Sequence, residues 1–122
     1  MASLSDDTLR KILLQIQQTA VQSQRALNVS RQQMSAKERE RRILQLTIAE
    51  IDSLDDSVNL YRGVGKMFLM VPRPTLQKEL KKEEKDLGDD IVALTKKSKY
   101  LEKEFNNAQG QLRDIFQSVP RS

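Results

Sequence analysis

Three short segments of this sequence carry residue types that could do chemistry. Gly63 to Lys66 matches the end of a phosphate-binding loop, but the first glycine of such a loop is missing and Met67 replaces the Ser or Thr needed for magnesium. Glu83-Glu84 and Asp89-Asp90 pair carboxylates that could serve as an acid and a base. Neighbours on a helix point in different directions, however. We therefore predict neither a nucleotide site nor a catalytic residue.

Cysteine and histidine are both absent from the 122 residues. Their absence removes thiol nucleophiles, disulfides, imidazole bases and the usual ligands of zinc and haem. Since nothing supports a disulfide framework, we expect an intracellular, cytoplasmic protein. The N-terminus lacks a signal-peptide pattern, and the longest apolar run, Met67 to Val71, is too short to span a membrane. We expect no enzyme activity, no cofactor, no metal and no membrane partner.

The net charge of +4 and the pI near 9.5 raise the question of nucleic-acid binding. Along the sequence, however, acidic and basic residues are spread evenly. The densest cluster, residues 37–42, alternates acids with bases. Such alternation is typical of a solvated helix and not of a surface that follows phosphates. The sequence therefore predicts no nucleic-acid partner.

Two long segments carry the apolar spacing of coiled-coil helices. In the first, a four-then-three spacing runs from Leu9 to Ile51, although Ser23, Ser30, Lys37 and Arg41 dilute it. In the second, one row repeats every seven residues and a second row follows it four residues later. The first row is Leu80, Leu87, Leu94, Leu101, Ala108 and Ile115, and the second is Glu84, Ile91, Ser98, Phe105, Leu112 and Val119. We predict helices over residues 4–52 and 73–119, the first capped by Ser3 or Ser5.

The period changes between the two helices. Residues 58–71 are rich in β-branched, aromatic and large apolar types, which predicts a β-hairpin. Gly65 and Lys66 can form its two-residue turn, with the positive φ on Gly65, and Pro72 and Pro74 end its second strand. The predicted fold class is all-α dominated with a small β-hairpin. It is an antiparallel two-helix coiled coil, with the hairpin between the helices, in a single domain over residues 1–122.

An isolated two-stranded hairpin is only marginally stable in water, and its edges and apolar side chains need a partner. The chain has no further strands to offer, so a sheet or barrel built from the hairpins of several subunits is the simplest solution. We therefore predict an oligomerisation surface on the hairpin. Its residues are Leu60, Tyr61, Val64, Met67, Phe68, Leu69, Met70 and Val71.

With this pattern in place, the segments Asn59 to Phe68 and Lys96 to Glu102 resemble β-type subunits of the prefoldin family. The hairpin segment Tyr61 to Phe68 is the most specific part, because heptads alone occur in many unrelated proteins. The resemblance implies a hetero-hexamer in which this chain joins two α-type and three further β-type subunits. It also implies an ATP-independent co-chaperone that captures unfolded actin and tubulin and delivers them to the cytosolic group II chaperonin.

An antiparallel pair of helices brings both chain termini to one tip. Surplus apolar side chains at a fraying tip can form a patch for non-native apolar segments. The residues expected to bind such clients are Leu4, Leu9, Ile12, Ile115, Phe116 and Val119. The alternative function is a structural coiled-coil tether or scaffold without holding activity, and heptads alone do not separate the two.

Overall fold

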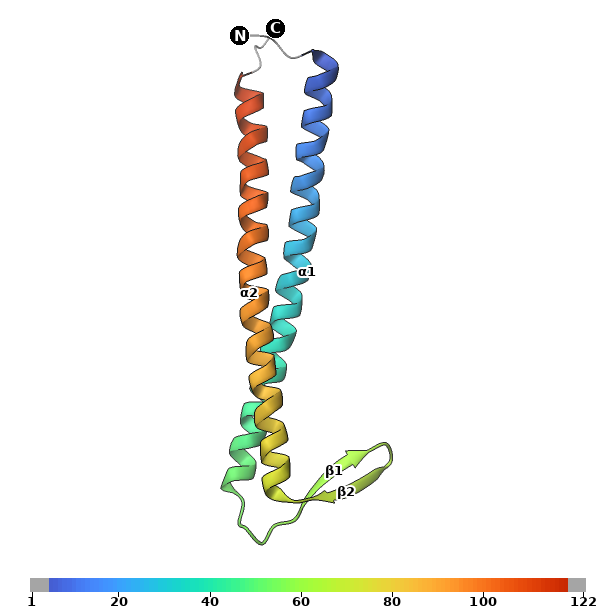
Figure 1. Ribbon diagram of the computed structural model, residues 1–122, viewed down its shortest axis with the longest axis vertical. Coiled ribbons are helices and arrows are strands. Elements are labelled where there is room, and N and C mark those ends of the chain that lie inside the picture. The colour runs from blue at the N-terminus through green and yellow to red at the C-terminus, as the bar shows by residue number, and fades with distance from the viewer. Residues whose placement is uncertain (1–4, 119–122) are drawn as a thin grey trace. The chain divides into compact units, whose positions relative to one another are not determined.

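The computed structural model describes residues 5–118, which form two long helices with a two-stranded sheet between them in the chain (Figure 1). Helix α1 spans Asp6–Ser53 and helix α2 spans Arg73–Ser118. Strands β1, Leu60–Val64, and β2, Met67–Val71, pair antiparallel. The predicted fold class is confirmed. Contacts divide the chain into two compact units, one formed by the described parts of residues 1–33 and 94–122, the other by residues 34–93.

The start of α1 is fixed by Ser5. Its Oγ accepts a hydrogen bond from the backbone N–H of Thr8 at 3.2 Å, which satisfies one of the orphan donors of the first turn. Asp6 and Asp7 follow at the positive end of the helix dipole. Because Ser5 is the cap, the helix begins at Asp6 and not at residue 4. The alternative cap, Ser3, lies outside the described residues.

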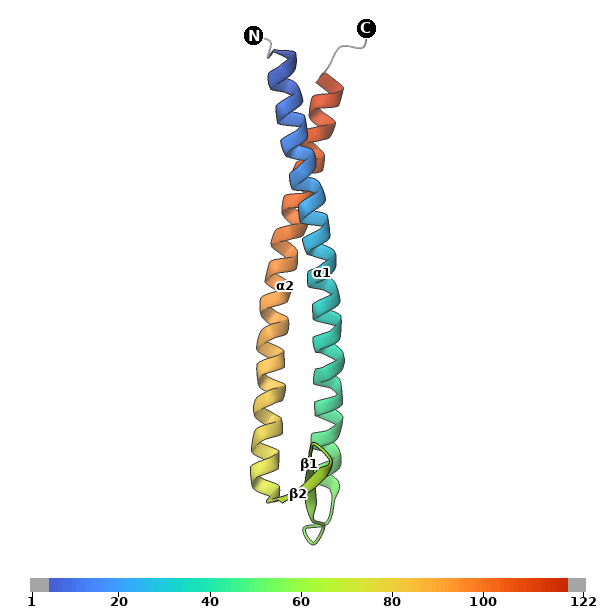
Figure 2. The same cartoon turned by 90° about the vertical axis from the view of Figure 1, so that its right-hand side faces the viewer.

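The coiled-coil seam predicted from the heptads is confirmed. Each predicted seam position from Leu9 to Ile51 is buried or half-buried, and so is each described position of the two rows in α2. The first unit buries mainly small side chains, namely Ala20, Ser23, Leu27, Ser30, Ser98, Leu101 and Ala108. Small side chains at these positions allow the two helices to pack closely, side by side in both ribbon views (Figures 1 and 2).

Polar pairs set the register of the helices in the first unit. Ser30, only 1% exposed, shares a hydrogen bond of 2.9 Å with Ser98 across the seam. Ser23 donates to Glu104 Oε2 at 3.5 Å. A shift of either helix by one turn would leave the Ser30 and Ser98 hydroxyls buried without this partner, so the pair favours one alignment.

In the second unit, the seam includes an ion pair among its apolar positions. Arg41 Nε donates to Glu84 Oε1 at 2.8 Å, and Gln45 Nε2 donates to the same oxygen at 3.1 Å. Gly88 makes room for the arginine, because a Cβ at this position would come within 3.1 Å of the guanidinium carbon. Gly88 therefore lies against the seam residue Arg41, although the heptad pattern places it outside the two rows.

The hairpin has the turn that the sequence predicts. The register runs from Leu60 opposite Val71 to Val64 opposite Met67, which leaves Gly65 and Lys66 as the two-residue turn. Gly65 has φ of +60°, whereas Lys66 does not have a positive φ. This combination is the type II′ turn, in which only the first central residue needs the conformation that glycine tolerates.

Candidate functional site

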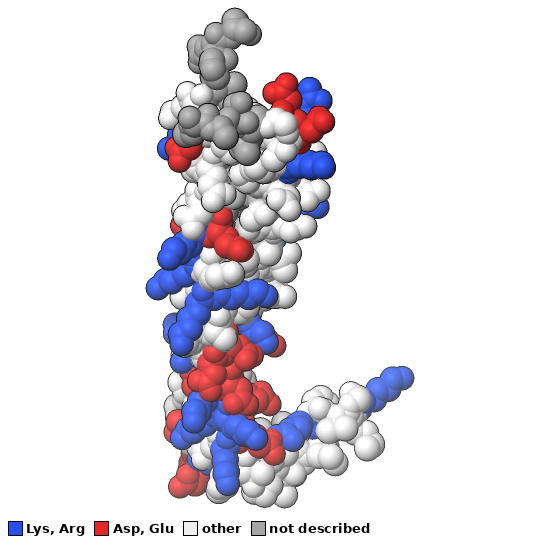
Figure 3. Space-filling model, turned by 45° about the horizontal axis from the view of Figure 1, so that its top comes forward, with Lys and Arg blue, Asp and Glu red and all other residues white. Residues whose placement is uncertain are grey.

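The hairpin exposes large apolar side chains along the whole of both strands. Phe68 is 76% exposed, Met67 65% and Met70 63%, and Tyr61, Val64 and Leu69 are exposed as well. Of the eight residues predicted for oligomerisation, only Leu60 and Val71 are half-buried. Figure 3 shows the hairpin as an almost uncharged projection with a basic side chain at its free end. An apolar patch of this kind on a small monomer marks an interaction site.

The strand register divides these side chains between two faces. Alternation along the strands places Leu60, Arg62 and Val64 on one face with their partners Met67, Leu69 and Val71. This face is turned toward α2, because Arg62 forms an ion pair with Glu79. The opposite face carries Tyr61, Phe68 and Met70, with the Phe68 ring over Gly63, where a Cβ would meet the ring at 3.7 Å. Both faces therefore present apolar area.

Arg73 joins the two helices next to the hairpin, a role that the sequence does not indicate. It is the first residue of α2, and its guanidinium donates to the carbonyl oxygens of Ile51 and Leu54 at 2.8 Å each and to Asp56 Oδ1 at 2.8 Å. The two carbonyls belong to the last turn of α1 and the residue after it, where backbone acceptors lack i+4 helical donors. The Ile51 oxygen also accepts from the Leu54 N–H at 3.2 Å. Arg73 thus ties the end of α1 to the start of α2 at the base of the hairpin.

The first turns of α1 and the last turns of α2 lie side by side within the first unit (Figures 1 and 2). Of the predicted client-binding residues, Leu9, Ile12 and Ile115 are half-buried, and Phe116 is 63% exposed. Leu4 and Val119 lie outside the described residues. The structure therefore brings four of the six residues to one end of this unit, where Phe116 presents the largest open apolar surface among them.

Comparison with known proteins agrees with this geometry. A profile described as "Prefoldin subunit" matches residues 14–119. The chain belongs to the prefoldin subunit family. It is 33% identical over 111 residues to a Schizosaccharomyces pombe protein named "Probable prefoldin subunit 1", covering 91% of this chain and 99% of the relative. It is 28% identical to human "Prefoldin subunit 1", covering 94% of each.

A solved structure extends the comparison to the fold. The prefoldin beta subunit from Thermococcus strain KS-1 superposes with a TM-score of 0.80 over 98% of this chain and 100% of the other, at 20% sequence identity. At this identity the likeness concerns the fold. Prefoldin subunits are components of a chaperone that assemble with other prefoldin subunits, which is consistent with an exposed apolar hairpin.

The carboxylates considered for catalysis have other surroundings in this prefoldin fold. Hydrogen bonds from Arg41, and then from Gln45, hold the pKa of the Glu84 carboxyl below its ordinary value of 4.5. Glu84 is therefore the ion-pair partner of Arg41 in the seam. Within residues 5–118, no group of three or more acidic, His or Cys side chains is placed to hold a metal ion. No helix in the same range is long and apolar enough to cross a membrane.

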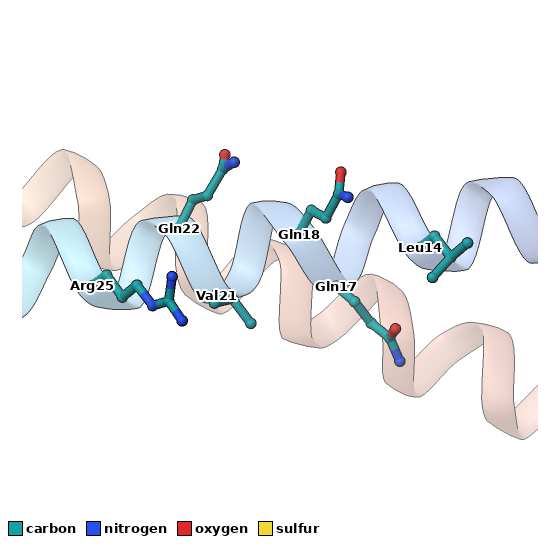
Figure 4. A pocket seen from close by; sticks show the side chains of 6 residues that line it. All are labelled: Leu14, Gln17, Gln18, Val21, Gln22 and Arg25. Carbon is teal, nitrogen blue, oxygen red and sulfur yellow. The ribbon is translucent and has the colours of Figure 1, made fainter.

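A hollow on the first unit lies along α1 (Figure 4). Its lining consists of two apolar side chains, three amides and one guanidinium: Leu14, Val21, Gln17, Gln18, Gln22 and Arg25. Gln18 and Gln22 point to one side of α1 and the other four side chains to the opposite side, so the hollow lies open along the helix (Figure 4). It offers neither a nucleophile nor a carboxylate.

Proposed function

We propose that this chain is a β-type subunit of a hetero-hexameric, ATP-independent co-chaperone in the cytoplasm. In this function it captures unfolded proteins, actin and tubulin among them, and delivers them to the group II chaperonin. The observation that carries the proposal is the hairpin, whose two strands expose apolar side chains on both faces. A soluble tether would not need such a surface.

The hairpin supports hetero-oligomerisation through its edges as well as its faces. Among the described residues the sheet contains two strands only, so β1 and β2 each have one edge without a strand partner. Unpaired edges favour strand addition from another chain, and closure into a barrel removes them. Two α-type and three further β-type subunits are the proposed source of the missing strands.

The end of the first unit supports client binding. Phe116 is largely exposed and the half-buried Ile12 lies outside the seam row, so both can contact an apolar segment of an unfolded chain without separating the helices. The central seam leaves less apolar surface open, because its positions are small, polar or covered. We therefore place client contact in this subunit at Leu9, Ile12, Ile115 and Phe116.

Native mass measurement of the complex purified from cells tests the assembly. We expect one copy of this chain with five other small subunits. A stand-alone dimer would contradict the proposal and would favour the coiled-coil tether.

Suppression of the aggregation of denatured actin tests client holding. We expect Ile12→Ser with Phe116→Ser, introduced into the assembled hexamer, to weaken protection while leaving the hexamer intact. The matched control is Val21→Ser with Val29→Ser, which removes two apolar side chains from exposed positions of α1 in the same unit. Equal protection by both variants would show that clients bind elsewhere.

A further inference from the structure

Folding gathers positive charge that is dispersed in the sequence. The first unit pairs the beginning of the chain with its end, so residues 8–33 lie with residues 94–113. These two segments contain nine basic and two acidic residues. The basic residues are Arg10, Lys11, Arg25, Arg31, Lys96, Lys97, Lys99, Lys103 and Arg113, and the acidic residues are Glu102 and Glu104. Asp6, Asp7 and Asp114 lie at the end of this unit, so its described residues hold nine basic and five acidic side chains in all. The second unit is closer to balance, with eleven basic and twelve acidic residues.

The two acidic side chains already have partners. Glu102 Oε2 lies 3.8 Å from Arg31 Nη2. Glu104 accepts hydrogen bonds from Ser23 and, at 3.3 Å, from the Tyr100 hydroxyl. The four lysines of this segment of α2, in contrast, form no ion pair with any described residue. Their positive charge therefore faces solvent.

Three of these lysines, Lys96, Lys99 and Lys103, form a row along α2. Their spacing of three and then four residues places them on one face, away from the buried seam positions Ser98 and Leu101. All three are exposed. Seven residues of helix rise by about 10 Å.

We infer that the lysine row, Lys96, Lys99 and Lys103, docks acidic segments of unfolded polypeptide. An extended chain places every second side chain on one side at intervals of about 6.6 Å. Neighbouring lysines three or four residues apart on a helix are separated by about 5–6 Å. Glutamates or aspartates at alternate positions of a client can therefore meet successive lysines. The inference rests on the proposed holding function and adds the class of segment that this face accepts.

A nucleic acid fits the row less well. A row of about 10 Å covers two or three phosphates, whereas sequence-independent binders of single strands follow the backbone over about 4 to 16 nucleotides and stack bases on several aromatic rings. Only one aromatic ring, Tyr100, lies beside the row, and its hydroxyl is bonded to Glu104. The short row and the single ring favour a polypeptide.

The test compares two triple variants in the assembled complex. The first is Lys96→Gln, Lys99→Gln and Lys103→Gln. The matched control is Lys78→Gln, Lys82→Gln and Lys85→Gln, which removes the same charge from exposed positions of the same helix, in the second unit. Glutamine and lysine have similar helix propensity, so neither variant should unfold α2. The probe is a short fluorescein-labelled peptide in which glutamate alternates with serine, and binding is followed by fluorescence anisotropy.

We expect the row variant to weaken binding of this peptide by about tenfold at an ionic strength of about 0.05 M, and the control by less than about twofold. At about 0.3 M the difference should largely vanish, because exposed charges are screened. Equal weakening by both variants would overturn the inference, since net charge alone would then explain binding. Tighter binding of single-stranded RNA, lost in the row variant, would overturn it in favour of a nucleic acid.

A second measurement separates this inference from the proposed function. The row variant should still suppress aggregation of a denatured client with a strongly basic composition. If the wild-type complex holds that client but does not bind the glutamate peptide, the proposed docking of acidic segments on the lysine row is wrong, and the holding function stands. If the wild-type complex holds no denatured client at all, the holding function itself is wrong.

Discussion

Replacing Phe68 and Leu69 by Asp is the most direct test of the hairpin as the assembly surface. Phe68 is 76% exposed, so its burial would remove about 150 Å² from water, which is worth about 4 kcal/mol. Leu69 is 51% exposed and adds about 2 kcal/mol. The double variant should therefore lower the association constant by about four orders of magnitude. Two buried carboxylates without partners would weaken association further.

The assay is co-purification of the other subunits with tagged wild-type or variant chain at equal expression. The control, Ile43→Glu with Leu46→Glu, places charge on two exposed apolar positions of α1 in the same unit as the hairpin. Far-UV circular dichroism should show helix content unchanged in both, because neither pair lies in the seam. Recovery of the other subunits at wild-type level with the Asp variant would refute the hairpin as the assembly surface.

Three further predictions concern the helices and their junction. Arg73→Gln removes three hydrogen bonds and should lower the free energy of unfolding by about 2 kcal/mol in urea titrations, with faster amide exchange in residues 54–59. Ser30→Ala should lower the free energy of unfolding by about 1 kcal/mol. The double variant with Ser98→Ala should lower it by less than the sum of the two single variants, since the two hydroxyls share one hydrogen bond. Because the pKa of Glu84 is lowered in the folded chain, its charged form stabilises the fold above pH 4.5, and this stabilisation is lost as the pH falls below 4.5. In urea titrations at several pH values, the free energy of unfolding of Glu84→Gln should therefore depend less on pH below 4.5 than that of the wild type.

Much of the fold could be predicted because its signals are local. A heptad pattern can be recognised from the sequence alone, without knowledge of any contact. The seam positions from Leu9 to Ile51 are buried or half-buried, as this spacing predicts. The hairpin turn was equally readable, since a type II′ turn requires glycine at its first central position and Gly65 occupies it. The hairpin's role in assembly and the client contacts at the tip remain predictions.

The remaining features depend on which residues meet across the fold. Arg73 is one of many arginines in the sequence, and only the structure shows that it reaches the carbonyls at the end of α1. Gly88 lies outside the heptad rows in the sequence, and only the structure shows that it lies against Arg41 from the other helix. The positive charge of the first unit was missed for the same reason: counting along the chain separates Arg31 from Lys99, whereas the antiparallel fold places them in one unit.

The distribution of apolar surface explains why this chain is built to be part of an assembly. The helix seam buries few large side chains and includes a serine pair and an arginine-glutamate pair, which fix the alignment of the helices more than they stabilise it. In the hairpin, Phe68, Met67 and Met70 are largely exposed, so they contribute little to the fold of the single chain. Burial of apolar area is the main favourable term in folding and association. The exposed apolar side chains of the hairpin would therefore add stability when another chain covers them.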